Sequence, residues 1–137
     1  MIWAVLDTNT VVSGFGWSGA PAQVVDFATR GEFVIVTSPA LLEELERVLK
    51  YPKLRRAFPE PEGLVELVRE VAEVVGTIPQ LNVCSDEADN RVLEAGVAGN
   101  ADVIVTGDAA LKGLNPVEGI QIVDAREFLR ILEGVGQ

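Results

Sequence analysis

The chain has 137 residues, of which 48% are hydrophobic and 23% charged, proportions typical of one globular domain spanning residues 1–137. It contains no histidine and one cysteine, Cys84, which excludes histidine general bases, Ser-His-Asp and Cys-His nucleophiles, and the usual zinc sites. Any hydrolytic chemistry must therefore use carboxylates, which in proteins hold hard cations such as Mg²⁺ or Mn²⁺.

The net charge of −10 argues against a large basic surface for nucleic acid. The positive charge is nevertheless concentrated, because five of the eleven basic residues fall in one short segment: Arg47, Lys50, Lys53, Arg55 and Arg56. No apolar run approaches the roughly 20 residues of a membrane span, and no signal peptide is recognisable. A single cysteine is consistent with a reducing compartment, so the predicted location is cytoplasmic, with no membrane partner.

Short apolar runs rich in β-branched residues predict strands, and apolar stripes at helical spacing predict helices. In the first half of the chain, the pattern predicts a strand at 2–6, a loop at 13–21, a helix at 21–30, a strand at 33–37 and a helix from 39 to about 50. In the second half it predicts a proline-punctuated basic segment, a helix at 62–75, a weaker strand at 80–84, a helix at 87–98, strands at 103–106 and 120–123, and a helix at 124–132.

Strands that alternate with helices pair in parallel through right-handed crossovers. The predicted fold class is therefore α/β: a three-layer α/β/α sandwich with a central, mostly parallel sheet of about five strands.

Acidic residues follow three of the predicted strands, at the sheet edge where parallel α/β proteins bind ligands. Asp7 comes directly after the first strand, Asp108 comes shortly after the strand at 103–106, and Asp86 and Asp89 follow the weaker strand. Each acid taken alone has another interpretation as a helix cap or turn residue, and Asp86 with Asp89 resembles a capping box. Together they predict a carboxylate cluster.

The helix at 39–50 offers a further acid. Its apolar stripe places Glu44 and Glu46 on the two margins, where a side chain can reach toward the sheet. Periodicity does not choose between them, and an exposed glutamate on a surface helix remains an alternative for each.

Three segments, VLDTNTVVSG, SPALLEELERVL and DEADNRVLEAGVAGNADVIVTGD, resemble the PIN-domain family, and most closely its branch of VapBC-type toxin components. The resemblance implies a PIN-like fold and a metal-dependent endoribonuclease that uses one or two Mg²⁺ or Mn²⁺ ions. It also implies an RNA substrate, a cognate antitoxin, and homodimerisation, which is common in the family.

Position by position, the resemblance assigns the catalytic and metal-binding roles to Asp7, Glu44, Asp89 and Asp108. It assigns supporting roles to Asn9 and Thr106, and makes Asp86 either an extra ligand or a cap. The five basic residues of 47–56, interleaved with aromatic side chains, are predicted to contact single-stranded RNA. Trp17 has three interpretations: stacking on a base, filling a subunit interface, or burial in the core.

Two other function classes remain open from the sequence. The chain is alternatively a non-catalytic PIN-fold module that binds RNA or protein, which the acidic charge favours. A further alternative is an aspartate-based phosphoryl-transfer or receiver domain, although Asn9 occupies the position where many phosphatases have a second aspartate.

Overall fold

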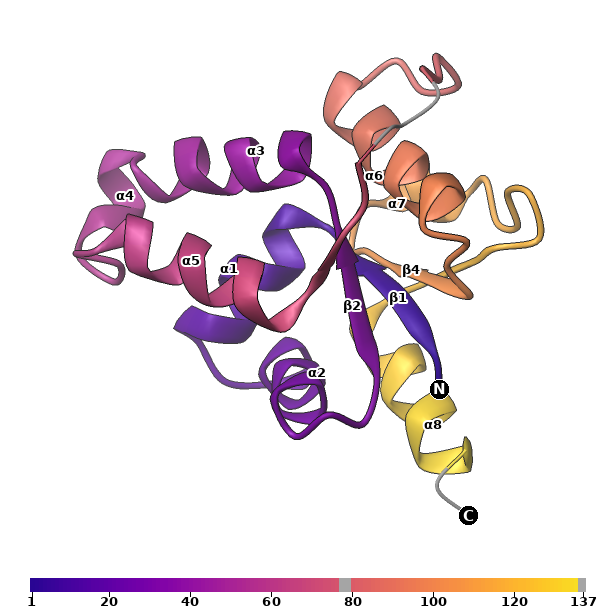
Figure 1. Cartoon of the computed structure of the whole chain (residues 1–137), viewed down its shortest axis with the longest axis horizontal. Helices are drawn as coiled ribbons and strands as arrows, with labels where there is room; N and C mark the ends of the chain where they lie inside the picture. Colours follow the sequence, from indigo (N-terminus) through magenta and orange to yellow (C-terminus); the bar gives the residue numbers. More distant parts are fainter. Residues whose placement is uncertain (77–79, 136–137) are drawn as a thin grey trace.

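The computed structural model describes residues 1–76 and 80–135 and contains a five-stranded sheet (Figure 1). The strands are β1 (Trp3–Leu6), β2 (Val34–Thr37), β3 (Glu73–Val74), β4 (Val103–Val105) and β5 (Gln121–Val123). Their order is β3-β2-β1-β4-β5, and every pairing is parallel. All five strands therefore have their carboxyl ends at the same edge of the sheet.

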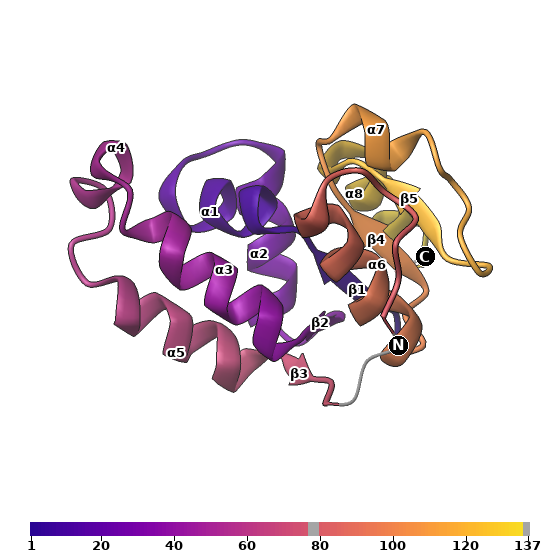
Figure 2. The same ribbon diagram turned by 90° about the horizontal axis from the view of Figure 1, so that it is seen from above.

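The helices are α1 (Thr8–Gly16), α2 (Ala20–Thr29), α3 (Pro39–Leu49), α4 (Pro52–Arg55), α5 (Pro61–Val71), α6 (Glu87–Ala98), α7 (Ala109–Lys112) and α8 (Ala125–Val135). Figure 2 shows that α1, α2, α3 and α5 lie apart from α6, with the sheet between the two groups. The three-layer prediction is therefore confirmed.

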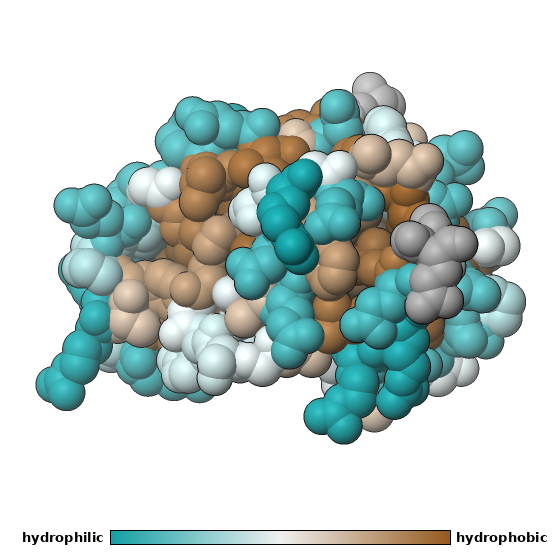
Figure 3. All heavy atoms as spheres, turned by 90° about the horizontal axis from the view of Figure 1, so that it is seen from below, coloured by the Kyte–Doolittle hydropathy of each residue, from teal (hydrophilic) through white to brown (hydrophobic). Residues whose placement is uncertain are grey.

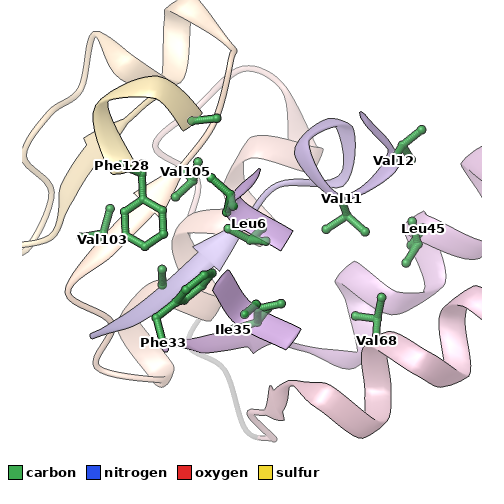
Figure 4. Close-up of a cluster of buried hydrophobic side chains, with 14 of the residues drawn as sticks. Leu6, Val11, Val12, Phe33, Ile35, Leu45, Val68, Val103, Val105 and Phe128 are labelled. Atoms are coloured by element: carbon green, nitrogen blue, oxygen red, sulfur yellow. The ribbon is translucent and has the colours of Figure 1, made fainter. Parts of the chain in front are cut away.

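Alternation along the strands supplies a core to each face of the sheet. Leu6, Ile35 and Val105 point to one face and pack with side chains of α1, α3, α5 and α8, where Phe128 meets Phe33 edge to face at 5.0 Å between ring centroids (Figure 4). Val5, Val36 and Ile104 point to the other face and pack against α6. Both faces of the central strands are buried, which explains why their sequences are continuously apolar.

The surface of the molecule carries both hydrophobic and hydrophilic side chains. Seen from below, hydrophobic side chains form areas on either side of a band of hydrophilic side chains near the middle of the face, and further hydrophilic side chains project at the rim (Figure 3). None of the helices in residues 1–76 and 80–135 is long and apolar enough to cross a membrane.

The predicted strand at 80–84 is wrong, because this segment forms no strand. The strand that completes the five-stranded sheet is instead β3, at 73–74. The predicted helix at 62–75 ends at Val71, so that the next residues pair with β2. The backbone of 80–84 bonds instead to side chains of α6: Leu81 N donates to Glu94 Oε2 at 2.7 Å, and Cys84 is held by Asn90.

The loop predicted at 13–21 is also partly wrong, because α1 continues to Gly16. Two glycines look unfavourable for a helix, but they let it pack closely. A Cβ at Gly14 would lie 2.4 Å from Val25 Cγ2 of α2, and one at Gly16 would lie 2.6 Å from the Phe58 ring. Tertiary packing therefore outweighs helix propensity here.

Candidate metal centre

An open cleft lies at the carboxyl edge of the sheet, beside β1 and β4. It is lined by Asp7, Thr8, Asn9, Glu44, Asp86, Ala88, Asp89, Val92 and Asp108. The structure thus brings all four acids predicted as catalytic, together with Asn9 and Asp86, to one cleft. The basic residues of 47–56 are not among its lining.

On the strand side of the cleft, Thr106 joins two of the acids. Its Oγ1 donates to Asp7 Oδ2 at 2.5 Å and accepts from Asp108 N at 3.0 Å. Thr106 is fully buried and Asp7 nearly so, so the bond between these two side chains is shielded from water. Asp7 Oδ1 accepts from Thr10 N at 2.9 Å as the N-cap of α1, and Asp108 Oδ1 accepts from Ala110 N at 2.8 Å as the N-cap of α7.

On the helix side, Asp86 and Asp89 belong to the start of α6. Because 80–84 is not a strand, they reach the cleft through this helix and not from a strand end, which corrects the placement expected from the sequence. Asp86 is the N-cap, its Oδ1 accepting from Ala88 N at 2.8 Å, while Asp89 lies in the first turn. The cap interpretation of Asp86 is therefore confirmed, although Asp86 also lines the cleft.

Sequence reasoning missed Asn90, which fixes the segment before α6. This fully buried side chain accepts from Cys84 N at 2.8 Å and donates from Nδ2 to Cys84 O at 2.9 Å. The two bonds hold residues 84–86 against the first turn of the helix. The sequence shows an asparagine directly after Asp89, but the spacing of residues does not indicate that its amide bonds to the backbone of Cys84.

The chemistry of the donor set fits a hard cation. One carboxylate oxygen each of Asp86, Asp89 and Asp108 lies within 4.8 Å of the others, and all three side chains offer oxygen, the ligand Mg²⁺ and Mn²⁺ prefer. Burial raises the pKa of Asp89 to about 6, helped by the negative charges of Asp108, Asp86 and Asp7. A bound cation would relieve this repulsion.

The two glutamates that periodicity could not separate have different surroundings. Glu44 lines the cleft, whereas Glu46 Oε1 accepts from Lys50 Nζ at 3.2 Å on the exposed side of α3. The structure thus favours the position that the resemblance assigned. The basic segment continues from the end of α3 into α4, at the end of the molecule away from α6 and α7 (Figure 1).

The fold has counterparts among solved structures. A chain of VapBC2 from Rickettsia felis, in a structure bound to a DNA fragment from their promoter, superposes with a TM-score of 0.60 at 15% identity, over 88% of this chain and 97% of that one. PAE2754 from Pyrobaculum aerophilum gives 0.57 at 15% identity, over 97% and 90%. The PIN domain of human SMG5 gives 0.51 at 12% identity, over 94% and 97%.

In sequence, the chain is 28% identical to the uncharacterized protein MJ1680 of Methanocaldococcus jannaschii over 134 residues, 95% of this chain and 81% of that protein. The family profile described as PIN domain matches residues 4–110, a range that includes Asp7, Glu44, Asp89 and Asp108. With this match over most of its length, the chain belongs to the PIN domain family.

Proposed function

We propose that this protein is a metal-dependent endoribonuclease whose active site is the acidic cleft. PIN domains are typically metal-dependent nucleases, and the cleft supports that activity here. The observation that carries the proposal is the convergence of three carboxylates within 4.8 Å of one another beside the buried Asp7.

The residues that would hold Mg²⁺ or Mn²⁺ are Asp86, Asp89 and Asp108, with Asp7 and Glu44 on the walls of the same cleft. One or two bound ions would lower the pKa of a coordinated water and neutralise charge on the phosphate. Asp86 thereby moves from a supporting role to a proposed ligand. Asp7, fixed by Thr106 and Thr10, contributes an oriented carboxylate that needs no rearrangement on binding.

In the proposed reaction, water attacks the phosphorus atom in line with the leaving oxygen. A new phosphorus–oxygen bond forms as the bond from phosphorus to the leaving oxygen breaks, and the leaving oxygen takes a proton from solvent. Glu44 projects from α3 and is not part of the cluster of Asp86, Asp89 and Asp108. We propose that Glu44 orients the attacking water and accepts its proton. In this proposal water is the nucleophile, so no covalent intermediate forms on the protein.

We further propose that the protein is the toxin of a toxin–antitoxin pair acting in the cytoplasm as a single domain, alone or as a homodimer. Support comes from the fold that it shares with the VapBC2 chain of Rickettsia felis. An antitoxin segment with an arginine would pair with the carboxylates of the cleft and compete with metal.

The test is cleavage of a panel of single-stranded and structured RNAs by purified protein in Mg²⁺, Mn²⁺ or EDTA. Asp108→Asn should lower the rate by about 10²-fold or more, because a ligand is lost. Asparagine is preferred to alanine because it retains the Oδ1 that caps α7, and losing that cap would destabilise the helix by about 1 kcal/mol.

Asp102→Asn is the matched control. Asp102 precedes β4 as Asp108 follows it, and its carboxylate accepts from Trp3 N at 2.9 Å at the opposite end of the strands. The control should cleave at the wild-type rate. Activity that persists in EDTA, or equal rates for the two variants, would refute the proposed site.

A further inference from the structure

The exposed face of α1 connects the acidic cleft with the basic segment. Asn9 and Ser13 are four residues apart and lie on the same face of α1, and Trp17 follows four residues later, just past the end of the helix. Trp17 is the C-cap residue after Gly16: its backbone is extended, and its N donates to Ser13 O, which keeps it against the last turn of the helix.

Successive positions of this row line two neighbouring hollows. Asn9 belongs both to the acidic cleft and to a second hollow whose lining includes Ser13, Gly107 and the exposed Arg126. Asn9 and Ser13 therefore lie on one surface that starts at the carboxylates of the cleft and continues past Asp124 and Arg126.

At the far end of the row, Trp17 has an aromatic surface available to a ligand. Its side chain is 53% exposed, and it meets Phe58 edge to face, with ring centroids 6.0 Å apart and an angle of 63° between planes. About half of the surface of Trp17 is therefore open to solvent, and an exposed aromatic ring is a surface on which a nucleobase stacks.

The contact with Phe58 also brings the basic segment to Trp17. Residues 47–58 contain five cations and no carboxylate. Within the part of the chain that the structure describes, Lys53, Arg55 and Arg56 are exposed and form no ion pair, whereas Lys50 pairs with Glu46 and Glu62. Arg47 is likewise exposed and unpaired among the described residues, so four of the five cations of the segment are left for an external anion in a protein of net charge −10.

From these observations we propose that single-stranded RNA binds along α1, with one base stacked on Trp17 and its phosphates near Lys53, Arg55 and Arg56. The inference rests on the proposed function and names the substrate class. Asp7 and Trp17 cap the two ends of α1, and about ten residues at roughly 1.5 Å each separate them by about 15 Å. A stacked strand rises about 3.4 Å per nucleotide, so the stacked base lies about four nucleotides from the scissile phosphate.

The sequence provides a direct probe, because the chain has only two tryptophans, Trp3 and Trp17. In Trp3→Phe, the remaining emission comes from Trp17, and in Trp17→Phe it comes from Trp3 at the opposite end of β1. An eight-nucleotide single-stranded RNA in Ca²⁺ buffer, checked by gel to remain intact, should quench the first variant and leave the second unchanged. A duplex of the same sequence should quench weakly, since its bases are already stacked.

Two substitutions measure the contributions separately. Trp17→Leu keeps an apolar cover on Phe58 and should weaken binding about tenfold, because the base has no ring to stack on. Arg55→Glu should weaken binding and make the slope of log affinity against log salt concentration shallower by about 0.7 for each phosphate that is no longer neutralised. Arg30→Glu, an equal charge change at the end of α2, is the matched control and should bind as the wild type does.

The inference fails if RNA leaves Trp17 emission unchanged, or if Arg30→Glu and Arg55→Glu have equal effects. A dependence of Trp17 emission on protein concentration without RNA would assign this surface to a second copy of the chain, and would also overturn it. Metal-dependent cleavage that persists beside any of these results would preserve the proposed function, so the two failures are distinguishable.

Discussion

The two sides of the acidic cleft are held by different means. On the strand side, Asp7 and Asp108 follow adjacent parallel strands and share the buried hydroxyl of Thr106. On the helix side, Asp86 and Asp89 begin α6 after a segment that pairs with no strand, and Asn90 holds that segment. The sheet itself positions the first pair, whereas side-chain hydrogen bonds position the second.

The difference has an electrostatic counterpart. Asp7 accepts two hydrogen bonds, one from Thr10 N and one from Thr106 Oγ1, which fix both of its carboxylate oxygens. Asp89 lies among like charges, and its raised pKa shows that its charged form is disfavoured. On the strand side, the carboxylate of Asp7 is therefore held in place before a cation binds. On the helix side, a bound cation would stabilise the charged form of Asp89.

The largest effect should follow from removing the hydroxyl that joins the strand-side acids. Thr106→Val keeps the shape of the side chain, but it removes the donor to Asp7 and the acceptor for Asp108 N. Loss of such support for metal ligands typically weakens metal binding about 10- to 100-fold. Titration calorimetry with Mn²⁺ measures this, and Thr106→Ser, which keeps the hydroxyl, should bind normally. Equal affinities for the valine variant and the wild type would show that Thr106 plays no part.

Asn90→Leu tests the helix side. Leucine leaves Cys84 N and Cys84 O without their buried partner, so the free energy of unfolding should fall by about 2–3 kcal/mol. Urea denaturation of the metal-free protein gives this value. Asn82→Leu, in the same segment but exposed, should change it by less than about 0.5 kcal/mol. If both variants lose the same stability, the paired hydrogen bonds of Asn90 do not hold the segment.

Asp89→Asn tests the electrostatic difference and should give the smallest effect. The folded pKa of about 6 exceeds the ordinary value of 3.8, so the native state retains a proton that the unfolded state releases between these pH values. The contribution of Asp89 to stability therefore falls as pH rises through this window. In EDTA, the asparagine variant should unfold at a higher temperature than the wild type above about pH 6, with the difference shrinking toward about pH 4.

Glu87→Gln is the control for that experiment, because it removes an exposed charge from the same turn of α6. It should show no such dependence on pH. Saturating Mg²⁺ should reverse the order of Asp89→Asn and the wild type. An asparagine variant that is less stable than the wild type throughout would contradict the proposed repulsion.

Much of the fold follows from local sequence patterns. The buried strands at 2–6, 33–37 and 103–106 are continuous apolar runs, and their helices carry clear stripes, so the structure places them within a residue or two of prediction. The errors lie where distant contacts decide. Close packing of Gly14 and Gly16 makes α1 a helix, and side chains from α6 replace a ladder at 80–84.

The candidate site shows the same division. Asp7 and Asp108 could be predicted from strand ends alone, since parallel strands bring their carboxyl ends together. Glu44 could not be separated from Glu46 by periodicity, because both lie on margins of one stripe. The role of Asn90 could not be predicted either, because it depends on how the backbone of Cys84 folds back onto α6, which no residue pattern indicates. Metal binding and RNA cleavage by these residues stay predictions.

Three of the cleft aspartates are also the residues that begin helices: Asp7 caps α1, Asp86 caps α6 and Asp108 caps α7. Glu44 and Asp89 carry no such duty. In a related protein that lost the activity but kept the fold, selection would retain short polar side chains at positions 7, 86 and 108, because these cap helices. Positions 44 and 89 would be free to vary. A relative with varied residues at positions 44 and 89, and with Asn, Ser or Thr at positions 7, 86 and 108, would therefore be identified as a protein that keeps the fold without the activity.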